Sequence, residues 1–151
     1  SLDEFLDALV TIFPEGNKSF SLIIADVDHF KYYNDTHGHQ MGDLVLVSIA
    51  SILKNSIRRG DLAARFGGEE FVVILPNCSK ENAVLIANKL RSAISDQNIQ
   101  FQNQQPMGNL TCTFGVATFP DDADTKELLL KRADECLYDG KARGRNKVVA
   151  A

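Results

Sequence analysis

Two apolar runs on either side of a glycine-rich acidic turn limit the folds open to this chain. Gly67-Gly68-Glu69-Glu70 separates residues 62–64 from residues 71–75, a pattern that predicts an antiparallel hairpin. Glycine supplies the positive-φ freedom that a tight turn needs, and it keeps side chains away from a docking ligand. Paired carboxylates at a bare turn suit a divalent cation better than they suit folding. Taken alone, the motif favours a solvent-exposed hairpin tip, and the rest of the chain reverses that interpretation.

The remaining segments alternate between strand and helix patterns. Residues 20–25 form a continuous apolar run that ends at Asp26, as expected of a strand in the centre of a sheet. Apolar residues at helical spacing predict helices over 42–57 and 79–94, the second with Ser79 as its N-cap. Further strands are predicted over 110–119 and 147–150. An α/β (α+β) class follows, a single sandwich with a central mixed, largely antiparallel sheet flanked by helices.

Local signals add detail at four places. A helix pattern over 2–13, with Phe5, Leu9 and Ile12 on its apolar side, ends at Pro14. Asp28 is placed to cap a short helix after the first strand. A connector rich in Gln and Asn has a short strand pattern over 99–101, and a capping box at 124–127 precedes a helix that runs to residue 140.

Bulk composition limits the class of protein. A length of 151 residues fits one domain, and a net charge of −4 argues against a nucleic-acid polymer as partner. The three cysteines are odd in number and show no metal-binding spacing, as expected of reduced thiols in the cytoplasm. No apolar run is long enough to span a bilayer, so we expect no membrane contact by this domain, even if the parent protein is membrane-attached. Because the chain opens at Ser1 without Met, we expect residues 1–151 to be a single domain excised from a longer protein.

The acidic turn and the first strand together predict a cation site. Asp26 stands at the carboxyl end of the buried strand, where α/β sheets bind ligands. If this strand pairs with the hairpin, Asp26 and Glu69 meet at one end of the sheet. Two close carboxylates repel each other unless a cation neutralises them, and Mg²⁺ binds one or two carboxylates together with substrate phosphates. On its own, Asp26 is as well explained as a helix cap.

Four sequence blocks together resemble the GGDEF family of diguanylate cyclases. Residues 26–35 (Asp-Val-Asp-His-Phe-Lys-Tyr-Tyr-Asn-Asp) precede residues 38–43 (Gly-His-Gln-Met-Gly-Asp) and the Gly-Gly-Glu-Glu-Phe of residues 67–71. Residues 133–146 then supply Ala-Asp, Leu-Tyr and Lys-Ala-Arg-Gly-Arg-Asn in the family's order. Each block alone is a modest signal, whereas four in order at the family's spacing are specific. The resemblance extends over residues 20–149 and implies a βαββαβ core similar to that of palm-type nucleotidyl cyclases.

The resemblance implies a catalytic domain that condenses two GTP molecules into cyclic di-GMP and releases two pyrophosphates. Asp26, Glu69 and the backbone carbonyl of Val27 would hold two Mg²⁺ (or Mn²⁺) ions for each GTP. Glu70 would act in catalysis beside Glu69, by deprotonating or orienting the attacking 3′-hydroxyl, although a metal ion could do this alone. The reaction needs two GTP-loaded domains, so a homodimer is implied, with a regulatory domain elsewhere in the parent chain.

The same resemblance assigns further residues to the substrate. Asn34 and Asp43 would read guanine, whose N1–H and N2–H₂ donors match an amide oxygen and a carboxylate. Outside this context, Asn34 would end one helix and Asp43 would cap the next. Cationic side chains near a helix C-terminus would otherwise complement its dipole. The residues implied to bind the β- and γ-phosphates are Lys31, Gly67, Gly68, Lys141 and Arg145.

Two further features concern regulation and the start of the domain. Arg58 and Asp61 form an Arg-x-x-Asp whose aspartate lies six positions before Gly67, where the resemblance implies an inhibitory site for the product cyclic di-GMP. Without that register, the motif would be a solvated helix end. The family's Asp-x-Leu-Thr-Gly-Leu-x-Asn-Arg segment is missing before the first helix. The alternative function is a catalytically weak sensor of GTP or cyclic di-GMP, although such proteins usually carry damaged Gly-Gly-Glu-Glu-Phe motifs.

Overall fold

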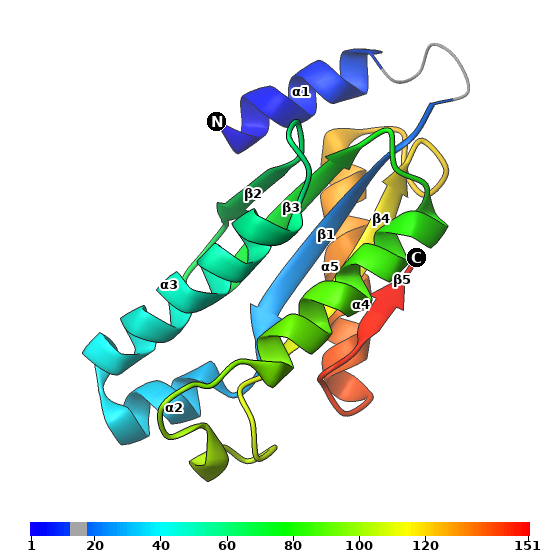
Figure 1. The fold of residues 1–151 in the computed structure, drawn as a ribbon. Helices are drawn as coiled ribbons and strands as arrows, with labels where there is room; N and C mark the ends of the chain where they lie inside the picture. Colours follow the sequence, from blue (N-terminus) through cyan, green and yellow to red (C-terminus); the bar gives the residue numbers. More distant parts are fainter. Residues whose placement is uncertain (13–17) are drawn as a thin grey trace.

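Helices and strands alternate along the chain in a computed structural model that describes residues 1–12 and 18–151 (Figure 1). A single 3₁₀ turn, η1 (Gln102–Gln104), lies in the connector before the fourth strand. The helices are α1 (Leu2–Ile12), α2 (Phe30–His37), α3 (His39–Ser56), α4 (Lys80–Asp96) and α5 (Lys126–Ala142). The strands are β1 (Phe20–Val27), β2 (Leu62–Arg65), β3 (Glu70–Pro76), β4 (Cys112–Phe119) and β5 (Val148–Ala150).

The strands form one mixed sheet in the order β2-β3-β1-β4-β5. β1 pairs antiparallel with both β3 and β4, and β2 with β3, whereas β5 runs parallel to β4. Helices α3 and α4 cover one face of the sheet, and α1 and α5 lie on the other (Figure 1). The predicted α/β class, the mixed sheet and the hairpin at 62–75 are therefore confirmed.

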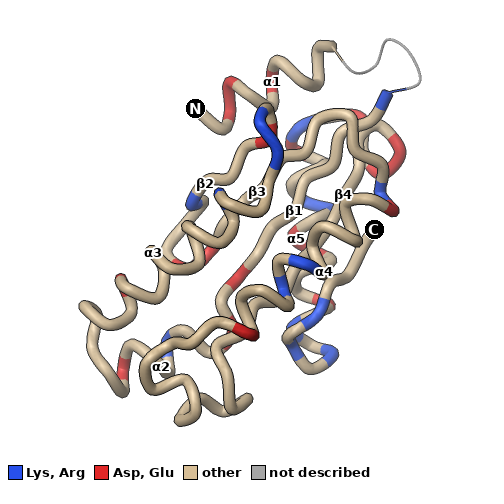
Figure 2. The backbone as a smooth tube through the Cα atoms, viewed as in Figure 1, with Lys and Arg blue, Asp and Glu red and all other residues tan. Residues whose placement is uncertain are grey.

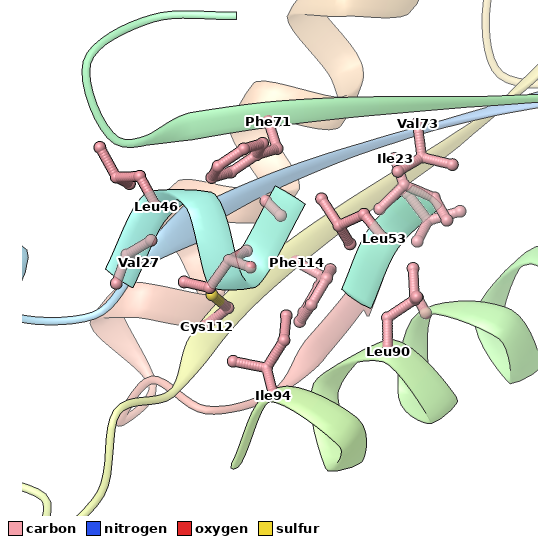
Figure 3. Packing of buried hydrophobic residues seen from close by; sticks show 14 of the residues in the cluster. Ile23, Val27, Leu46, Leu53, Phe71, Val73, Leu90, Ile94, Cys112 and Phe114 are labelled. Atoms are coloured by element: carbon pink, nitrogen blue, oxygen red, sulfur yellow. The ribbon is translucent and has the colours of Figure 1, made fainter. Parts of the chain in front are cut away.

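β1 is buried along its whole length because both faces of the sheet are covered. Ile23 and Val27 point into a core with Phe114 from β4 and Leu90 from α4 (Figure 3). Ile24 on the opposite face packs in a second core beneath α1 and α5. Burial of each aliphatic side chain stabilises the folded state by about 1.5–3 kcal/mol. Packing in both cores therefore fixes the position of the end of β1.

Several local expectations need correction. Leu6, rather than Ile12, is the buried anchor of α1, since Ile12 is 62% exposed. The predicted end of this helix at Phe13 and Pro14 lies outside the described residues. Residues 99–101 form no strand, and a 3₁₀ turn follows them.

The predicted N-caps of α4 and α5 differ in outcome. The hydroxyl of Ser79 accepts from the backbone N–H of Asn82, as predicted. Thr125, not Asp124, caps α5, and its hydroxyl accepts from the backbone N–H of Leu128. Both residues can accept such a bond, so the pattern located the helix start to within one residue.

The helices also bear on membrane insertion. In the part of the chain that the structure describes, none of them combines the length and the apolar character needed to cross a bilayer.

Cys78 and Cys112 are buried, Cys136 is partly buried, and all three are free thiols, which agrees with the expectation of reduced cysteines.

Candidate active site

Strand pairing brings the acidic residues to one end of the sheet. In the register of β1 and β3, Asp26 lies opposite Glu70. The backbone N–H of Val27 donates to the carbonyl of Glu69 at 3.2 Å. Asp26 is only 4% exposed, whereas Glu69 and Glu70 are half-buried. The convergence of Asp26 and Glu69 follows from the central place of β1, as the sequence indicated.

Lys141 on α5 supplies a positive charge to this acidic cluster. Its Nζ lies 2.9 Å from Oδ2 of Asp26. α5 can approach the sheet this closely because β4 carries Gly115, where an added Cβ would lie 2.1 Å from the carbonyl oxygen of Ala133. Lys and Arg gather at the end of α5 and in the loop that follows it (Figure 2). The sequence analysis assigned Lys141 to phosphate, and in this structure the ammonium contacts Asp26.

The three carboxyl groups all have raised pKa values. Burial is the main cause for Asp26, and the nearby Lys141 ammonium partly offsets the rise in its pKa. Burial and then the negative charge of Asp26 raise the pKa of Glu69. The pKa of Glu70 rises for the same two reasons, with Asp134 adding to the effect. Glu70 and Asp26 each influence the pKa of the other, so the two carboxyl groups lie close together.

The donor set suits a hard divalent cation. Burial and repulsion disfavour the ionised carboxylates, and a bound cation would reverse both effects. Within the described residues, no three His, Cys, Asp or Glu side chains are placed to hold a metal by themselves. Mg²⁺ takes one or two carboxylates and completes its shell with water and substrate phosphates. Asp26, Glu69 and the Val27 carbonyl fit that requirement.

Two adjoining cavities share Phe30, Lys31 and Glu69 as lining residues. The first, of about 170 Å³, is lined by the Asp26–Lys141 ion pair and is termed the charged cavity. The second, of about 420 Å³, lies between α2, α3 and the hairpin and also has charged residues in its lining. The first is also lined by Asp26, Val27, Asp28, His29, Lys141 and Arg145. The second is also lined by Asn34, Asp35, His39, Asp43, Leu46, Arg65 and Gly68.

The cavities separate the residues expected to bind phosphate from those expected to read guanine. Lys31 lines both, and its exposed ammonium lies 2.9 Å from Asp35. Arg145 lines the first cavity, whereas Asn34 and Asp43 line the second. Glu70 lines neither cavity and lies beside Asp26 instead. A molecule with a charged end and a flat polar end would match this division.

Asn34 is held against a bare part of α3. Its Oδ1 is buried and has no hydrogen-bond partner in the described part of the chain. An added Cβ at Gly42 would lie only 1.7 Å from that oxygen, so glycine is what allows the side chain to lie there. An unsatisfied buried acceptor is costly, and a donor-bearing ligand would relieve that cost after a small rotation of the amide.

The hairpin turn differs from expectation in its backbone. Neither Gly67 nor Gly68 adopts a positive φ. Open space surrounds the Cβ position of Gly68, and only the Glu70 carboxylate comes within 4 Å of that of Gly67. The glycines therefore keep the turn bare, as predicted, without supplying left-handed backbone. Gly68 lines the second cavity, and Gly67 lines neither.

Sequence reasoning missed Arg65, which braces this turn. Its guanidinium donates to the carbonyl of Gly67 at 3.2 Å and to that of Gly68 at 3.0 and 2.6 Å. It also lines the second cavity. The carbonyls of a bare turn need donors, and an Arg immediately before such a turn is the signal that could have identified it.

Asp28 does not cap α2, contrary to expectation. His29 occupies the N-cap position, in a left-handed conformation and without a side-chain cap bond. The Asp28 carboxylate accepts from the hydroxyls of Thr111 and Thr113, each at 2.7 Å, and from the backbone N–H of Asn146 at 3.0 Å. These donors come from distant parts of the sequence, so they cannot be seen in the residues around Asp28. The local pattern therefore indicated only a helix cap.

Arg58 and Asp61 lie together at a separate place. The guanidinium of Arg58 donates twice to the Asp61 carboxylate, at 3.2 and 3.1 Å, and to the carbonyl of Pro76 at 3.0 Å. Both side chains line a cavity of about 460 Å³ with Ile86 and Lys89 of α4, which shares no lining residue with the two described above.

Known proteins resemble this chain over nearly its whole length. The family described as "Diguanylate cyclase, GGDEF domain" matches residues 1–147. Diguanylate cyclase A of Treponema denticola is 38% identical over 145 residues, which cover 95% of this chain and 38% of that protein. The response regulator PleD of Caulobacter vibrioides is 43% identical over 144 residues, which cover 95% of this chain and 32% of PleD. This chain thus spans well under half the length of these relatives.

Solved structures agree with the fold. The GGDEF domain of DgcB from Caulobacter crescentus, in complex with c-di-GMP, matches with a TM-score of 0.87 at 33% identity and covers 99% of this chain and 87% of that chain. The active GGEEF domain of a diguanylate cyclase from Vibrio cholerae matches with a TM-score of 0.85 at 27% identity and covers 98% of this chain and 92% of that chain.

Proposed function

The chain belongs to the GGDEF domain family, and we propose that it is a diguanylate cyclase domain of the Gly-Gly-Glu-Glu-Phe form. It would condense two GTP molecules into cyclic di-GMP and release two pyrophosphates. The observation that carries the proposal is the pair of adjoining cavities that share Glu69, one lined by Asp26, Lys141 and Arg145 and the other by Asn34 and Asp43. A nucleoside triphosphate has this division between a charged and a flat polar end.

Asp26, Glu69 and the Val27 carbonyl would hold Mg²⁺ or Mn²⁺. When bound, such ions neutralise the triphosphate and stabilise the charge that develops on the leaving pyrophosphate. The raised pKa values of both carboxyl groups support this assignment, because a cation favours their ionised forms. Lys141 forms an ion pair with Asp26 in this structure. When the metal ions and GTP bind, its ammonium would move to a phosphate oxygen of the substrate.

Lys31, Lys141 and Arg145 would bind the phosphates beyond the reacting centre. All three line the charged cavity, and Arg presents a fork that matches phosphate oxygens bidentately, whereas Lys acts as a point charge. Asn34 and Asp43 would accept from the guanine edge in the second cavity. Adenine would leave the Asp43 carboxylate unpaired, so GTP is the favoured nucleotide.

Glu70 would manage the proton of the attacking hydroxyl. The 3′-oxygen of one GTP attacks the α-phosphorus of the other, the bond to the α–β bridging oxygen breaks, and pyrophosphate leaves with that electron pair. The hydroxyl proton passes to Glu70, whose pKa is raised by burial and by Asp26, which suits a carboxylate that must accept a proton near neutrality. The group lies beside Asp26 and outside the cavity, so it meets a hydroxyl that arrives from a second domain.

The reaction therefore calls for two copies of the domain. Each copy holds one GTP, and the two hydroxyls attack reciprocally. Because this chain covers only 38% and 32% of two curated relatives, a regulatory domain of the parent protein would bring the copies together.

The first experiment incubates the domain with GTP and Mg²⁺ over a range of protein concentrations. We expect cyclic di-GMP and pyrophosphate, with a rate that rises as the square of protein concentration while the dimer is scarce. Glu70→Gln should bind GTP and lower the rate by about a hundredfold, as expected for loss of a general base. GTP binding without product at any concentration, even after fusion to a coiled-coil dimer, would favour the sensor function instead.

We also propose product inhibition at Arg58 and Asp61. The separate cavity beside them and the DgcB structure solved in complex with c-di-GMP support this assignment. Arg58 is already paired with Asp61, whose side chain is only 3% exposed, whereas the Arg58 side chain is 59% exposed. The ligand would therefore meet the open side of the Arg58 guanidinium and leave the pair with Asp61 in place. Arg58→Ala should keep the initial rate and shift the inhibitory concentration of cyclic di-GMP upward by about tenfold or more. Unchanged inhibition would rule this site out, and Arg59→Ala serves as the neighbouring control.

A further inference from the structure

We infer that Asp28 is a positioning residue that fixes the phosphate-binding loop after α5 relative to the metal-binding end of β1. The inference rests on the proposed function, since it assigns Asp28 a part in binding the triphosphate. Asp28 is 3% exposed and has no ion pair with a Lys or Arg of the described residues. Its carboxylate instead accepts hydrogen bonds from strand β4, from the residue that precedes β4 and from the loop after α5.

The bonds to Asp28 join three segments of the chain. Thr111 Oγ1 donates to one carboxylate oxygen and Thr113 Oγ1 to the other, each at 2.7 Å. The backbone N–H of Asn146 donates to the same carboxylate at 3.0 Å and to Thr113 Oγ1 at 3.1 Å. The backbone N–H of Asp28 in turn donates to the carbonyl of Thr111 at 2.9 Å. With both oxygens engaged by buried donors, Asp28 is poorly placed to act as a metal ligand, although it is two residues from Asp26.

The loop that Asp28 holds has an unusual backbone. Gly144, Arg145 and Asn146 have φ values of 112°, 65° and 47°, so three successive residues adopt left-handed conformations. Non-glycine residues in this region cost roughly 1 kcal/mol or more each and persist only when other contacts enforce them. The bond to Asp28 is such a contact, and a second one joins the Asn146 side chain to Arg91 Nη1 at 3.2 Å.

The consequence falls on Arg145, which lies between the fastened residue Asn146 and the end of α5. Its side chain lines the charged cavity together with Asp26 and Lys31. If the Asp28 anchor is removed, the strained backbone is free to relax, and Arg145 leaves its place in the wall of the charged cavity. Asp28 also lines this cavity, but both of its carboxylate oxygens are engaged by protein donors, so it would act on the triphosphate through Arg145.

The test measures binding of a GTP analogue with a methylene bridge between its α- and β-phosphates, in the presence of Mg²⁺. Asp28→Asn keeps the side-chain volume but replaces one charged acceptor oxygen with an amide group that cannot accept. We expect an affinity loss of about tenfold. Asp121→Asn, the same change at an exposed position, should bind as the wild type does. Guanosine, which lacks phosphates, should bind both variants alike.

A double-mutant cycle separates positioning from a simple change of charge near the metal. In an Arg145→Ala background, Asp28→Asn should cost less than about twofold, because the residue it acts through is gone. An equal loss in both backgrounds would overturn the inference and assign the effect to electrostatics at Asp26. If the wild-type domain itself binds no analogue, the proposed function fails, and the role of Asp28 fails with it.

Hydrogen exchange provides a readout that does not depend on nucleotide. The Asn146 amide should exchange about a hundredfold faster in Asp28→Asn than in the wild type, as expected when a local opening becomes easy. Thr111→Val, which is nearly isosteric and removes one donor to Asp28, should show a smaller change in the same direction if Asp28→Asn fails to fold. Thr113→Val is less suitable, because Thr113 Oγ1 itself accepts from the Asn146 N–H at 3.1 Å. Faster exchange with unchanged affinity for the analogue would contradict a positioning role.

Discussion

Replacing Asp26 with Asn should reduce cyclic di-GMP formation by about a thousandfold, a loss expected when a metal ligand is removed from a phosphoryl-transfer site. The variant keeps the shape of the side chain in a fully packed strand end. It removes the buried charge that would hold the cation. Glu69 is then the only carboxylate left to bind the cation beside the Val27 carbonyl. Rates are compared at saturating GTP and Mg²⁺, with pyrophosphate release as the measurement.

Stability should move in the opposite direction to activity in this variant. The pKa of Asp26 is raised in the folded domain, so the folded state binds the proton more tightly than the unfolded chain does. The metal-free domain therefore loses stability as pH rises above the ordinary value of 3.8. At neutral pH the amide avoids this cost, and Lys141, whose side chain is 31% exposed, can turn toward solvent. We expect the metal-free variant to unfold at a temperature no lower than the wild type.

Metal binding provides the discriminating measurement. With the methylene-bridged GTP analogue present, Mg²⁺ at a hundred times its dissociation constant should stabilise the wild type by about 2.7 kcal/mol. For a domain of this size that is a rise of about 5 °C or more in the unfolding temperature. Asp26→Asn should lose this increment, whereas Asp121→Asn should keep it. A variant that retains both the increment and a tenth of the activity would exclude Asp26 as a metal ligand.

The features predicted correctly from sequence have local or strand-level causes. The hairpin turn at residues 67–70 and the cap at Ser79 depend on neighbours within four positions. The meeting of Asp26 and Glu69 depends on one further step, the pairing of a buried central strand with the hairpin. Once β1 is central, its pairing with the hairpin fixes where Asp26 and Glu69 lie along the sheet. The residue pattern alone was therefore sufficient to predict that they meet.

The features that escaped prediction depend on long-range contacts. The donors to Asp28 come from residues 83, 85 and 118 positions away in the sequence, so its neighbours indicated only a helix cap. The ion pair between Lys141 and Asp26 likewise depends on how closely α5 approaches β4 at Gly115. Neither the distance between a helix and a sheet nor the partners of a buried carboxylate can be read from periodicity.

Gly42→Ala should weaken GTP binding by about tenfold to a hundredfold, the cost expected when a base-reading hydrogen bond is removed. The new methyl group would overlap Oδ1 of Asn34, 1.7 Å away, and would displace that side chain from the second cavity. Phe30, with a ring atom 3.1 Å from the same position, limits the directions in which the methyl group can be accommodated. The change therefore removes Asn34 from the site by steric means.

Gly42→Ala should impair recognition of the guanine base without destabilising the fold. Alanine in place of glycine within a helix normally stabilises it by about 1 kcal/mol, so α3 should remain folded and the unfolding temperature should change little. The preference for GTP over ATP should fall with GTP affinity, because adenine lacks the N1–H and N2–H₂ donors of guanine from which Asn34 would accept. Affinity for inorganic triphosphate, which reports the charged cavity alone, should be unchanged.

Combination with Asn34→Ala decides whether the two residues act as one unit. Each single change should cost a similar loss of GTP affinity, and the double variant should lose no more than either one, since the second change removes a side chain that the first has already displaced. Ser51→Ala, on the exposed side of α3, should leave binding unaffected. Additive losses, or a Gly42→Ala domain that still prefers GTP over ATP as strongly as the wild type, would separate Asn34 from base recognition and leave Asp43 as the residue to examine.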